Sequence, residues 1–416
     1  MIDIPNLMFI SSILSVIAYK LYTVRNISGI SDIDFFAFYG IAVTAYILSR
    51  FALAEKFEYE KPGPLFLPSV SVIIPAYNEE KLIGQTLKHH INSDYPSDRL
   101  EIIVVNDGST DRTAEETTEV IRRHPGTAIR LINFPKNRGK RCALAAGMRA
   151  AAGEVIVVND SDSFVHPDAV RRIVQPLADN SIGGVTGHAD VYNWKENLLT
   201  KIQYIRYFVA FRVYKAAESL YDSVICLSGC LAAYPKSVIM GFIEEWENQK
   251  FWGMRCTYGD DRGLTTFVLR TGLSATYQPL AITETVVPTS FEGFWKQQLR
   301  WKKSWIRETY FVGKFMWKKH PIMAMSFYSN AFLTLFSFVI VLRVFFILPA
   351  LESTLPFFYL IGLALVSFVY LAYCNKHGIH QGWIFPILWS VLYALVLVWQ
   401  IPIAFLTLRD SRWLTR

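Results

Sequence analysis

Long apolar stretches at both ends of the chain, with a polar stretch between them, limit the possible folds more than any other feature. Apolar segments run at about 5–23 and 34–53, and again at about 322–349, 355–374 and 382–407. Each is close to the roughly 20 residues that an α-helix needs to cross a bilayer. The sequence therefore predicts two spans, then a polar domain, then a second membrane region.

The composition agrees with a membrane protein. Hydrophobic residues make up 52% of the chain and charged residues only 19%, against about 25% in soluble domains. The net charge is +7, but the sequence contains no long Lys/Arg run and no nucleic-acid-binding motif, so nucleic acid is excluded as a partner. Lipid headgroups or a diphosphate account for the excess of basic residues. The five cysteines lack metal-site spacing and are expected to be free thiols.

The distribution of basic residues predicts the orientation in the membrane. Arg50 lies near the end of the second apolar segment and Lys56 follows it, which places the polar domain in the cytosol and the protein in the cell membrane as a multi-pass protein. Arg416 ends a basic tail that is also expected in the cytosol. Three full spans would put that tail outside. Since the last segment contains Pro386 and Pro402, part of it is expected to be re-entrant or interfacial.

The polar middle of the chain alternates short Val/Ile-rich runs with amphipathic helices such as 79–91 and 111–123. The runs are Val70–Ile74, Ile102–Val105, Ile129–Ile132 and Val155–Val158. Such alternation predicts an α/β, doubly wound, Rossmann-like domain whose ligands lie at the carboxyl ends of parallel strands. The predicted division is two amino-terminal transmembrane helices (1–60), the cytosolic domain (61–288), interfacial amphipathic helices (289–320) and carboxy-terminal transmembrane or re-entrant helices (321–416).

Two acidic pairs carry the strongest chemical signal. Asp160 and Asp162 follow a buried strand, where two carboxylates are costly unless a cation binds them, as Mg²⁺ or Mn²⁺ with substrate phosphate would. A solvated acidic turn is the alternative. Asp261 is the candidate general base, and its neighbour Asp260 is expected to raise the pKa of the pair. The alternative is an N-cap with a salt bridge to Arg262.

Other motifs are ambiguous when taken singly. Tyr77 could stack on a base or pack in the core, and Asp107 could accept hydrogen bonds from a base or ribose. Lys140 lies in a basic loop that suits phosphate or uracil as well as solvent. Arg300 could stabilise a diphosphate and Trp301 could stack on a sugar ring, although an interfacial aromatic belt looks the same.

The order of these motifs resembles the signature series of processive family-two glycosyltransferases. The series is Tyr77-Asn78-Glu79, Asp107-Gly108-Ser109, Gly139-Lys140-Arg141, Asp160-Ser161-Asp162, Gly259-Asp260-Asp261-Arg262 and Gln297-x-x-Arg300-Trp301. The resemblance implies a GT-A domain, inversion at the anomeric carbon and a polymer channel formed by the enzyme's own helices. Within the family the chain looks most like class I hyaluronan synthases and, next, the rhizobial chitin-oligosaccharide synthase.

The resemblance also implies roles for individual residues. Nucleotide contacts are expected from Tyr77, Glu79, Asp107, Lys140, Asp160, Arg300, Trp301, Trp413 and Arg416; metal contacts from Asp162 and Asp160; acceptor contacts from Ser228, Gly229, Cys230, Gln297 and Trp301; and catalysis from Asp261 and Asp260. The donors would be UDP-GlcNAc and UDP-GlcA with Mg²⁺ or Mn²⁺, and the partners a growing polysaccharide and the lipid bilayer. Whether the protein is a monomer or a homo-oligomer stays open.

Three departures from the family pattern bear on the sugar and on priming. Cys230 stands where hyaluronan synthases usually have proline, Leu414 replaces a glycine, and Gly263 replaces a His or Cys. A synthase that makes GlcNAc-only chitin oligosaccharides is therefore the alternative. A non-processive transferase acting on a lipid phosphate and a non-catalytic membrane sugar transporter are the remaining candidates, and two ordered acidic motifs argue against the transporter.

Overall fold

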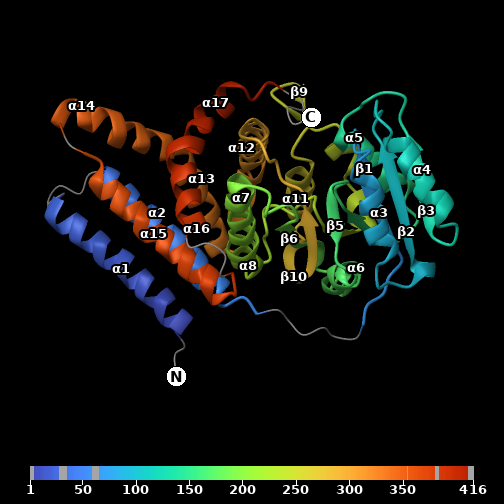
Figure 1. The fold of residues 1–416 in the computed structure, drawn as a ribbon, viewed down its shortest axis with the longest axis horizontal. Coiled ribbons are helices and arrows are strands. Elements are labelled where there is room, and N and C mark those ends of the chain that lie inside the picture. Colours follow the sequence, from blue (N-terminus) through green and yellow to red (C-terminus); the bar gives the residue numbers. More distant parts are fainter. Residues whose placement is uncertain (1–3, 28–34, 59–64, 354, 380–383, 411–416) are drawn as a thin grey trace.

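The computed structural model describes residues 4–27, 35–58, 65–353, 355–379 and 384–410. Apolar helices gather on one side of the molecule and an α/β domain on the other, with α7 (Leu198–Val209) and α12 (Phe291–Gly313) between them (Figure 1). The apolar helices and the α/β domain therefore occupy separate parts of the molecule.

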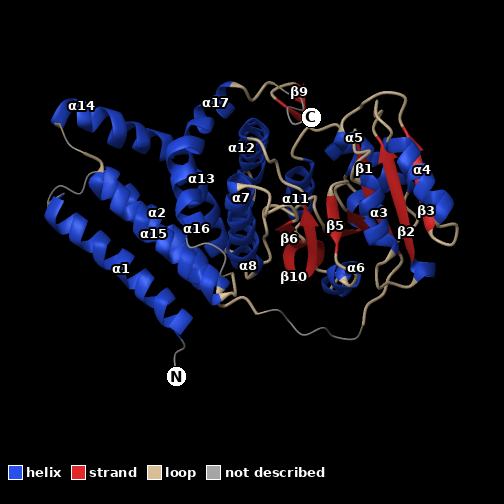
Figure 2. Cartoon of the chain, in the orientation of Figure 1, coloured by secondary structure: helices blue, strands red, loops and turns tan. Residues whose placement is uncertain are grey.

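One mixed sheet forms the centre of the α/β domain (Figure 2). Its strands are β1 (Val70–Ala76), β2 (Leu100–Asn106), β3 (Ala128–Asn133), β4 (Val155–Val158), β5 (Ser163–Val165), β6 (Ile182–Val191), β7 (Ala232–Pro235) and β10 (Ser274–Thr285), in the order β3-β2-β1-β4-β7-β6-β10-β5. The first four are parallel, as the sequence predicts. β7 runs antiparallel to both β4 and β6, and β5 antiparallel to β10, so the second half is mixed. β8 (Lys250–Phe251) and β9 (Met254–Arg255) form a separate small hairpin.

Alternate residues of the central strands pack against different helices. Ile73 of β1 belongs to the same hydrophobic cluster as α5 (Lys140–Ala150), whereas Ile74 belongs to the cluster that contains residues of α3 (Ile83–Ile91) and α4 (Thr113–Arg123). Successive side chains of a strand point to opposite faces, so helices on both faces bury every residue of β1. This is the doubly wound arrangement predicted from the continuous apolar runs.

Shorter helices complete the domain. They are α6 (Ala169–Val174), α8 (Ala216–Ser219), α9 (Lys236–Met240), α10 (Ile243–Glu247) and α11 (Asp260–Arg270), with a π-helical segment Ala210–Lys215 that joins α7 to α8. Helix α11 matters most for function, because its first turn carries the second acidic pair.

The apolar helices are α1 (Ile4–Ile27), α2 (Phe35–Ala54), α13 (Pro321–Leu342), α14 (Leu348–Glu352), α15 (Phe357–Lys376), α16 (Ile384–Val391) and α17 (Gln400–Leu406). Among the described residues, four segments are long and apolar enough to cross a membrane: Ile4–Thr23, Pro321–Leu351, Tyr359–Lys376 and Ile384–Leu406. Phe38–Ala54 is a shorter apolar helix. The last segment is not one continuous α-helix, since π- and 3₁₀-helical turns at 392–399 separate α16 from α17. The predicted re-entrant course of this segment stays a prediction.

Candidate active site

Lys140 connects the two acidic motifs. Lys140 is the first residue of α5. Its ammonium group donates a hydrogen bond to Asp160 Oδ1 at 2.5 Å and lies 3.4 Å from Asp260 Oδ2. Asp160 follows β4 and Asp260 opens α11, so one cation gathers three segments at the carboxyl ends of the strands. Burial disfavours the charge, but the two carboxylates outweigh it and raise the pKa of Lys140.

Asp107 holds the basic loop in place. Its two carboxylate oxygens accept hydrogen bonds from the backbone N–H groups of Arg138 (2.7 Å) and Gly139 (2.9 Å). Gly139 has a φ of +93°, which lets the backbone turn directly into α5. Burial raises the pKa of Asp107 despite these hydrogen bonds. Asp107 therefore fixes the position of Lys140. The sequence predicts a nucleotide contact for Asp107 but not this structural role.

Asp162 is the carboxylate best suited to a divalent cation. Burial, together with the neighbouring charge of Asp160, raises the pKa of Asp162 to about 6. A negative charge that the protein disfavours in this way is stabilised by a bound cation. No group of three or more His, Cys, Asp or Glu side chains with metal-site geometry occurs among the described residues. Mg²⁺ or Mn²⁺ would take one or two carboxylates here together with substrate phosphate.

Asp260 and Asp261 differ sharply in their surroundings. Asp260 is buried, and Lys140 outweighs the effect of burial so that the pKa of Asp260 is lowered. The expectation that the pair would have a raised pKa is wrong for this residue, because the sequence does not show that Lys140 lies beside it. Asp261 is less buried and accepts hydrogen bonds from the Arg262 N–H at 2.7 Å and the Cys226 thiol at 3.5 Å.

Helix α12 packs directly against the start of α11. Gly259 has a φ of +69°, and a Cβ there would lie 2.0 Å from Ser304 Oγ. Beside it, the Arg307 guanidinium donates to the Tyr258 carbonyl at 2.5 Å and pairs with Glu308 at 2.9 Å. These contacts set the position of the acidic turn, so the acidic motif requires glycine at 259.

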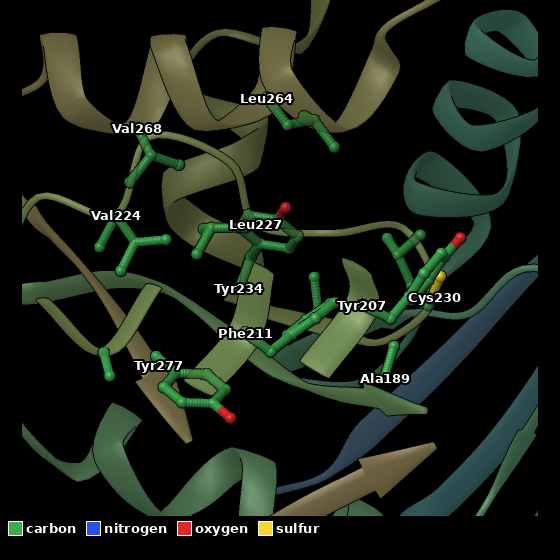
Figure 3. Close-up of a cluster of buried hydrophobic side chains, with 14 of the residues drawn as sticks. Ala189, Tyr207, Phe211, Val224, Leu227, Cys230, Tyr234, Leu264, Val268 and Tyr277 are labelled. Atoms are coloured by element: carbon green, nitrogen blue, oxygen red, sulfur yellow. The ribbon is translucent and has the colours of Figure 1, made fainter. Parts of the chain in front are cut away.

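The predicted acceptor loop lies against the Lys140–Asp160 pair. A Cβ at Gly229 would be 3.2 Å from Asp160 Oδ1 and 3.5 Å from Lys140 Nζ. The Ser228 N–H donates to Thr186 Oγ1 at 3.1 Å, which fixes the loop to β6. Cys230 is buried beside Tyr207 at one end of the cluster in Figure 3, and burial with the Asp160 charge raises the pKa of its thiol to about 12. Cys230 is therefore a neutral packing residue here.

The Gln297–Trp301 segment lies on α12 next to this centre. Asp260 and Asp160 are the carboxylates that act most strongly on Arg300, although burial prevails and lowers its pKa. Trp301 packs against Tyr207, with ring centroids 6.4 Å apart, and under the Arg206 guanidinium. Gln297 accepts a long hydrogen bond of 3.5 Å from Gln298. The structure thus brings Arg300 to the acidic centre and turns Trp301 toward α7.

The first motif belongs to a neighbouring pair of loops. The Glu79 N–H donates to Thr113 Oγ1 at 2.7 Å, and Asn78 Oδ1 accepts from the Thr110 N–H at 2.9 Å. Tyr77, which is half-buried, follows β1 at this edge of the sheet. These contacts join the turns after β1 and β2 beside Asp107.

The end of the described chain returns to the site. Asp410 lies 3.9 Å from Lys303 Nζ through its carboxylate, and its carbonyl accepts a hydrogen bond from the Tyr258 hydroxyl at 3.3 Å. Trp413 and Arg416, predicted to contact the nucleotide, lie outside the described residues.

Arg141 has a supporting role that the sequence does not predict. It is buried, donates to the Trp246 carbonyl and Gln249 Oε1 at 2.7 Å each, and would lie 2.9 Å from a Cβ at Gly263. The departure at Gly263 therefore makes room for a buried guanidinium behind α11. In the sequence Arg141 is only one more cation in a basic loop, which gives no sign of burial.

Comparison with known proteins identifies the family. Residues 68–304 match the model of the "Glycosyltransferase like family 2". The chain is 34% identical to an N-acetylglucosaminyltransferase of Mesorhizobium japonicum over 58% of its own length and 57% of that protein. It is 32% identical to the hyaluronan synthase of Streptococcus pyogenes over 73% of its own length and 71% of that protein. The chain thus aligns with little more than half of the Mesorhizobium protein.

A solved structure shows the same fold. The mannosyltransferase PcManGT of Pyrobaculum calidifontis, determined in complex with GDP-Man and Mn²⁺, superposes with a TM-score of 0.61 at 23% identity. The superposition covers 86% of this chain and 98% of that one, and it establishes the GT-A fold. With the family match, the ordered acidic motifs and the apolar helices, the chain is a membrane-associated glycosyltransferase of family 2.

Proposed function

We propose that this enzyme is a processive, inverting synthase that polymerises UDP-GlcNAc and UDP-GlcA into hyaluronan and passes the product into its membrane helices. The observation that carries the proposal is the position of α12 between the acidic centre and the apolar region. Arg300 faces the carboxylates, while Gln400 of α17 donates to the Trp295 carbonyl on the same helix at 2.9 Å. A chain extended at this centre is released next to the membrane helices.

The chemistry follows from the charges at the site. Asp261 accepts the proton of the acceptor hydroxyl as its oxygen attacks the anomeric carbon, and the bond from that carbon to the UDP oxygen breaks. Attack opposite the leaving group inverts the configuration. Lys140 and Arg300 place two cations where negative charge develops on the diphosphate. A divalent cation held by Asp162, with Asp160 beside it, would neutralise further diphosphate charge.

The membrane setting follows the distribution of charge. Lys56 is exposed just after α2, and basic residues next to spans favour the cytosolic side. We therefore assign the catalytic domain to the cytosol, where nucleotide sugars are available, and the protein to the cell membrane.

The test is to incubate the purified full-length protein in lipid vesicles with each UDP-sugar alone and with both together. A product that requires both donors and is degraded by a specific hyaluronidase is expected. A product formed from UDP-GlcNAc alone and degraded by chitinase would contradict the hyaluronan assignment while leaving the transferase in place. Absence of UDP release with either donor would contradict both.

That second outcome is the alternative function, a GlcNAc-only oligosaccharide synthase. It is supported by the 34% identity over 244 residues to the Mesorhizobium N-acetylglucosaminyltransferase, a value that a second streptococcal hyaluronan synthase equals over 275 residues. The streptococcal match is longer, at 306 residues against 244, and for this reason we place hyaluronan first.

A further inference from the structure

Two cations and three aromatic rings lie close together on α7, α12, α16 and the π-helical turn that follows α16. We call Arg206, Lys302, Trp301, Trp389 and Tyr393 the cation–aromatic cluster. The Arg206 guanidinium lies 4.5 Å from the centroid of the Trp301 ring and 5.6 Å from that of Trp389. The Lys302 ammonium lies 5.4 Å from the centroid of Tyr393 and 3.4 Å from Gln400 Oε1. The cluster therefore connects the predicted acceptor residue Trp301 to the last apolar segment.

Neither cation has a carboxylate partner within the part of the chain that the structure describes. Among the described residues, the Arg206 guanidinium lies over aromatic rings, and the Lys302 ammonium lies over a ring and next to a neutral amide. Both side chains are half-buried, and the positive charge of Arg206 repels the protonated form of Lys302. Burial and this repulsion lower the pKa of Lys302 to about 7. Two cations kept close together without a counter-charge favour binding of an anion.

The surroundings specify the kind of anion. Flat aromatic faces suit a sugar ring, and guanidinium and ammonium groups suit a carboxylate. The diphosphate would lie with Lys140 and Arg300, whereas Trp389 and Tyr393 belong to the apolar segment. An acidic sugar combines both requirements in one residue of a polymer, which a neutral GlcNAc unit does not.

We propose that Arg206 and Lys302 bind the carboxylates of uronic-acid residues in the growing chain as it moves from Trp301 toward α16. This inference rests on the proposed function and adds the residues that select an acidic over a neutral polymer. The cations hold the chain in the enzyme between successive transfers, so they also lengthen the product. They are specificity residues and take no part in the transfer of the proton to Asp261.

The test uses full-length protein in lipid vesicles and two probes, a hyaluronan octasaccharide and a neutral chitin oligosaccharide. Lys302→Gln and Arg206→Gln are expected to weaken hyaluronan binding about tenfold each, the size of one lost charge-assisted contact. Chitin binding should change less than about twofold, and Lys302→Arg should restore hyaluronan binding. Lys296→Gln is the matched control, since Lys296 lies on the same helix but is paired with Glu292 at 2.6 Å.

The outcomes separate the two proposals. Equal losses for both probes, or unchanged hyaluronan binding in the Gln variants, would overturn the carboxylate assignment even if the wild-type enzyme makes hyaluronan. If the wild-type enzyme fails to incorporate glucuronate but still binds the hyaluronan probe through these cations, the hyaluronan synthase proposal fails and the acidic-sugar site stands. Shorter products from the Gln variants than from the Lys296→Gln control would support the proposal further.

Discussion

Lys140 donates a hydrogen bond to Asp160 at 2.5 Å, and this contact joins the start of α5 to the end of β4. Asp260 lies 3.4 Å from the same ammonium group. Two carboxylates from separate motifs thus share one cation.

We expect Lys140→Met to lower the transfer rate at least about 100-fold, because the diphosphate loses a fixed cation and the two carboxylates lose their counter-charge. UDP-release kinetics measure the loss. Lys136→Met, an exposed cation in the preceding loop, should have little effect; similar losses for both variants would contradict the assignment.

Asp261 is expected to be the general base. Asp261→Asn keeps the size of the side chain but removes the proton acceptor, so turnover should fall at least about 1,000-fold. Affinity for UDP, measured by calorimetry, should stay within about twofold of the wild-type value. Polymer synthesis by this variant at an appreciable rate would rule out the role.

Metal binding is expected to depend on Asp162. Chelation with EDTA should abolish transfer and addition of Mg²⁺ or Mn²⁺ should restore it, because the diphosphate needs a counter-charge when it leaves. Asp162→Asn should weaken activation by Mn²⁺ at least about tenfold in a titration of UDP release. Full activity in EDTA would show that the protein cations suffice.

Gly259 is expected to tolerate no side chain. Gly259→Ala adds a left-handed strain of about 1–2 kcal/mol and a Cβ that would lie 2.0 Å from Ser304 Oγ, which displaces the acidic turn. Transfer should fall at least about tenfold. Gly253→Ala is the matched control, because Gly253 has a φ of +80° and nothing within 4 Å of an added Cβ. Equal effects of the two changes would show that strain alone accounts for the loss.

His90 is expected to limit stability in acid. It is fully buried, and neither ring nitrogen makes a hydrogen bond to the described residues. Burial lowers the pKa of His90 from its usual 6.5 to about 3. Between these two pH values the unfolded chain binds a proton at His90 and the folded protein does not. This contribution to stability is complete above pH 6.5 and is lost as the pH falls toward 3.

Replacing His90 with an apolar residue should therefore stabilise the protein. His90→Leu should raise the free energy of unfolding by about 1–3 kcal/mol at pH 7, because it removes two unsatisfied nitrogens, and by more at pH 5. Thermal unfolding at the two pH values measures the difference. His89→Leu is the contrast, since His89 Nδ1 hydrogen-bonds to the Val165 carbonyl at 3.0 Å and its loss should destabilise the protein. A lower melting temperature for His90→Leu would contradict the prediction.

Local patterns in the sequence predicted most of the framework. The Val/Ile runs that became β1 to β4 are buried by helices on both faces, and a continuous apolar run of that length has few other stable environments. The antiparallel β7 was not predicted, because Ala232–Pro235 is too short to carry a periodic signal. The order of the acidic motifs and their places after a strand and at the start of a helix were also readable from the sequence.

The sequence by itself determined the chemical groups and their order: paired carboxylates, a basic loop, an Arg-Trp pair and apolar segments on both sides. Only the tertiary structure decided which of these charged groups lie close enough to interact electrostatically. Lys140 lowers the pKa of Asp260. Arg206 on α7 and Lys302 on α12 repel each other, and no carboxylate among the described residues pairs with either. The physical reason is that electrostatic interactions depend on distance and burial, which link residues that lie far apart in the chain.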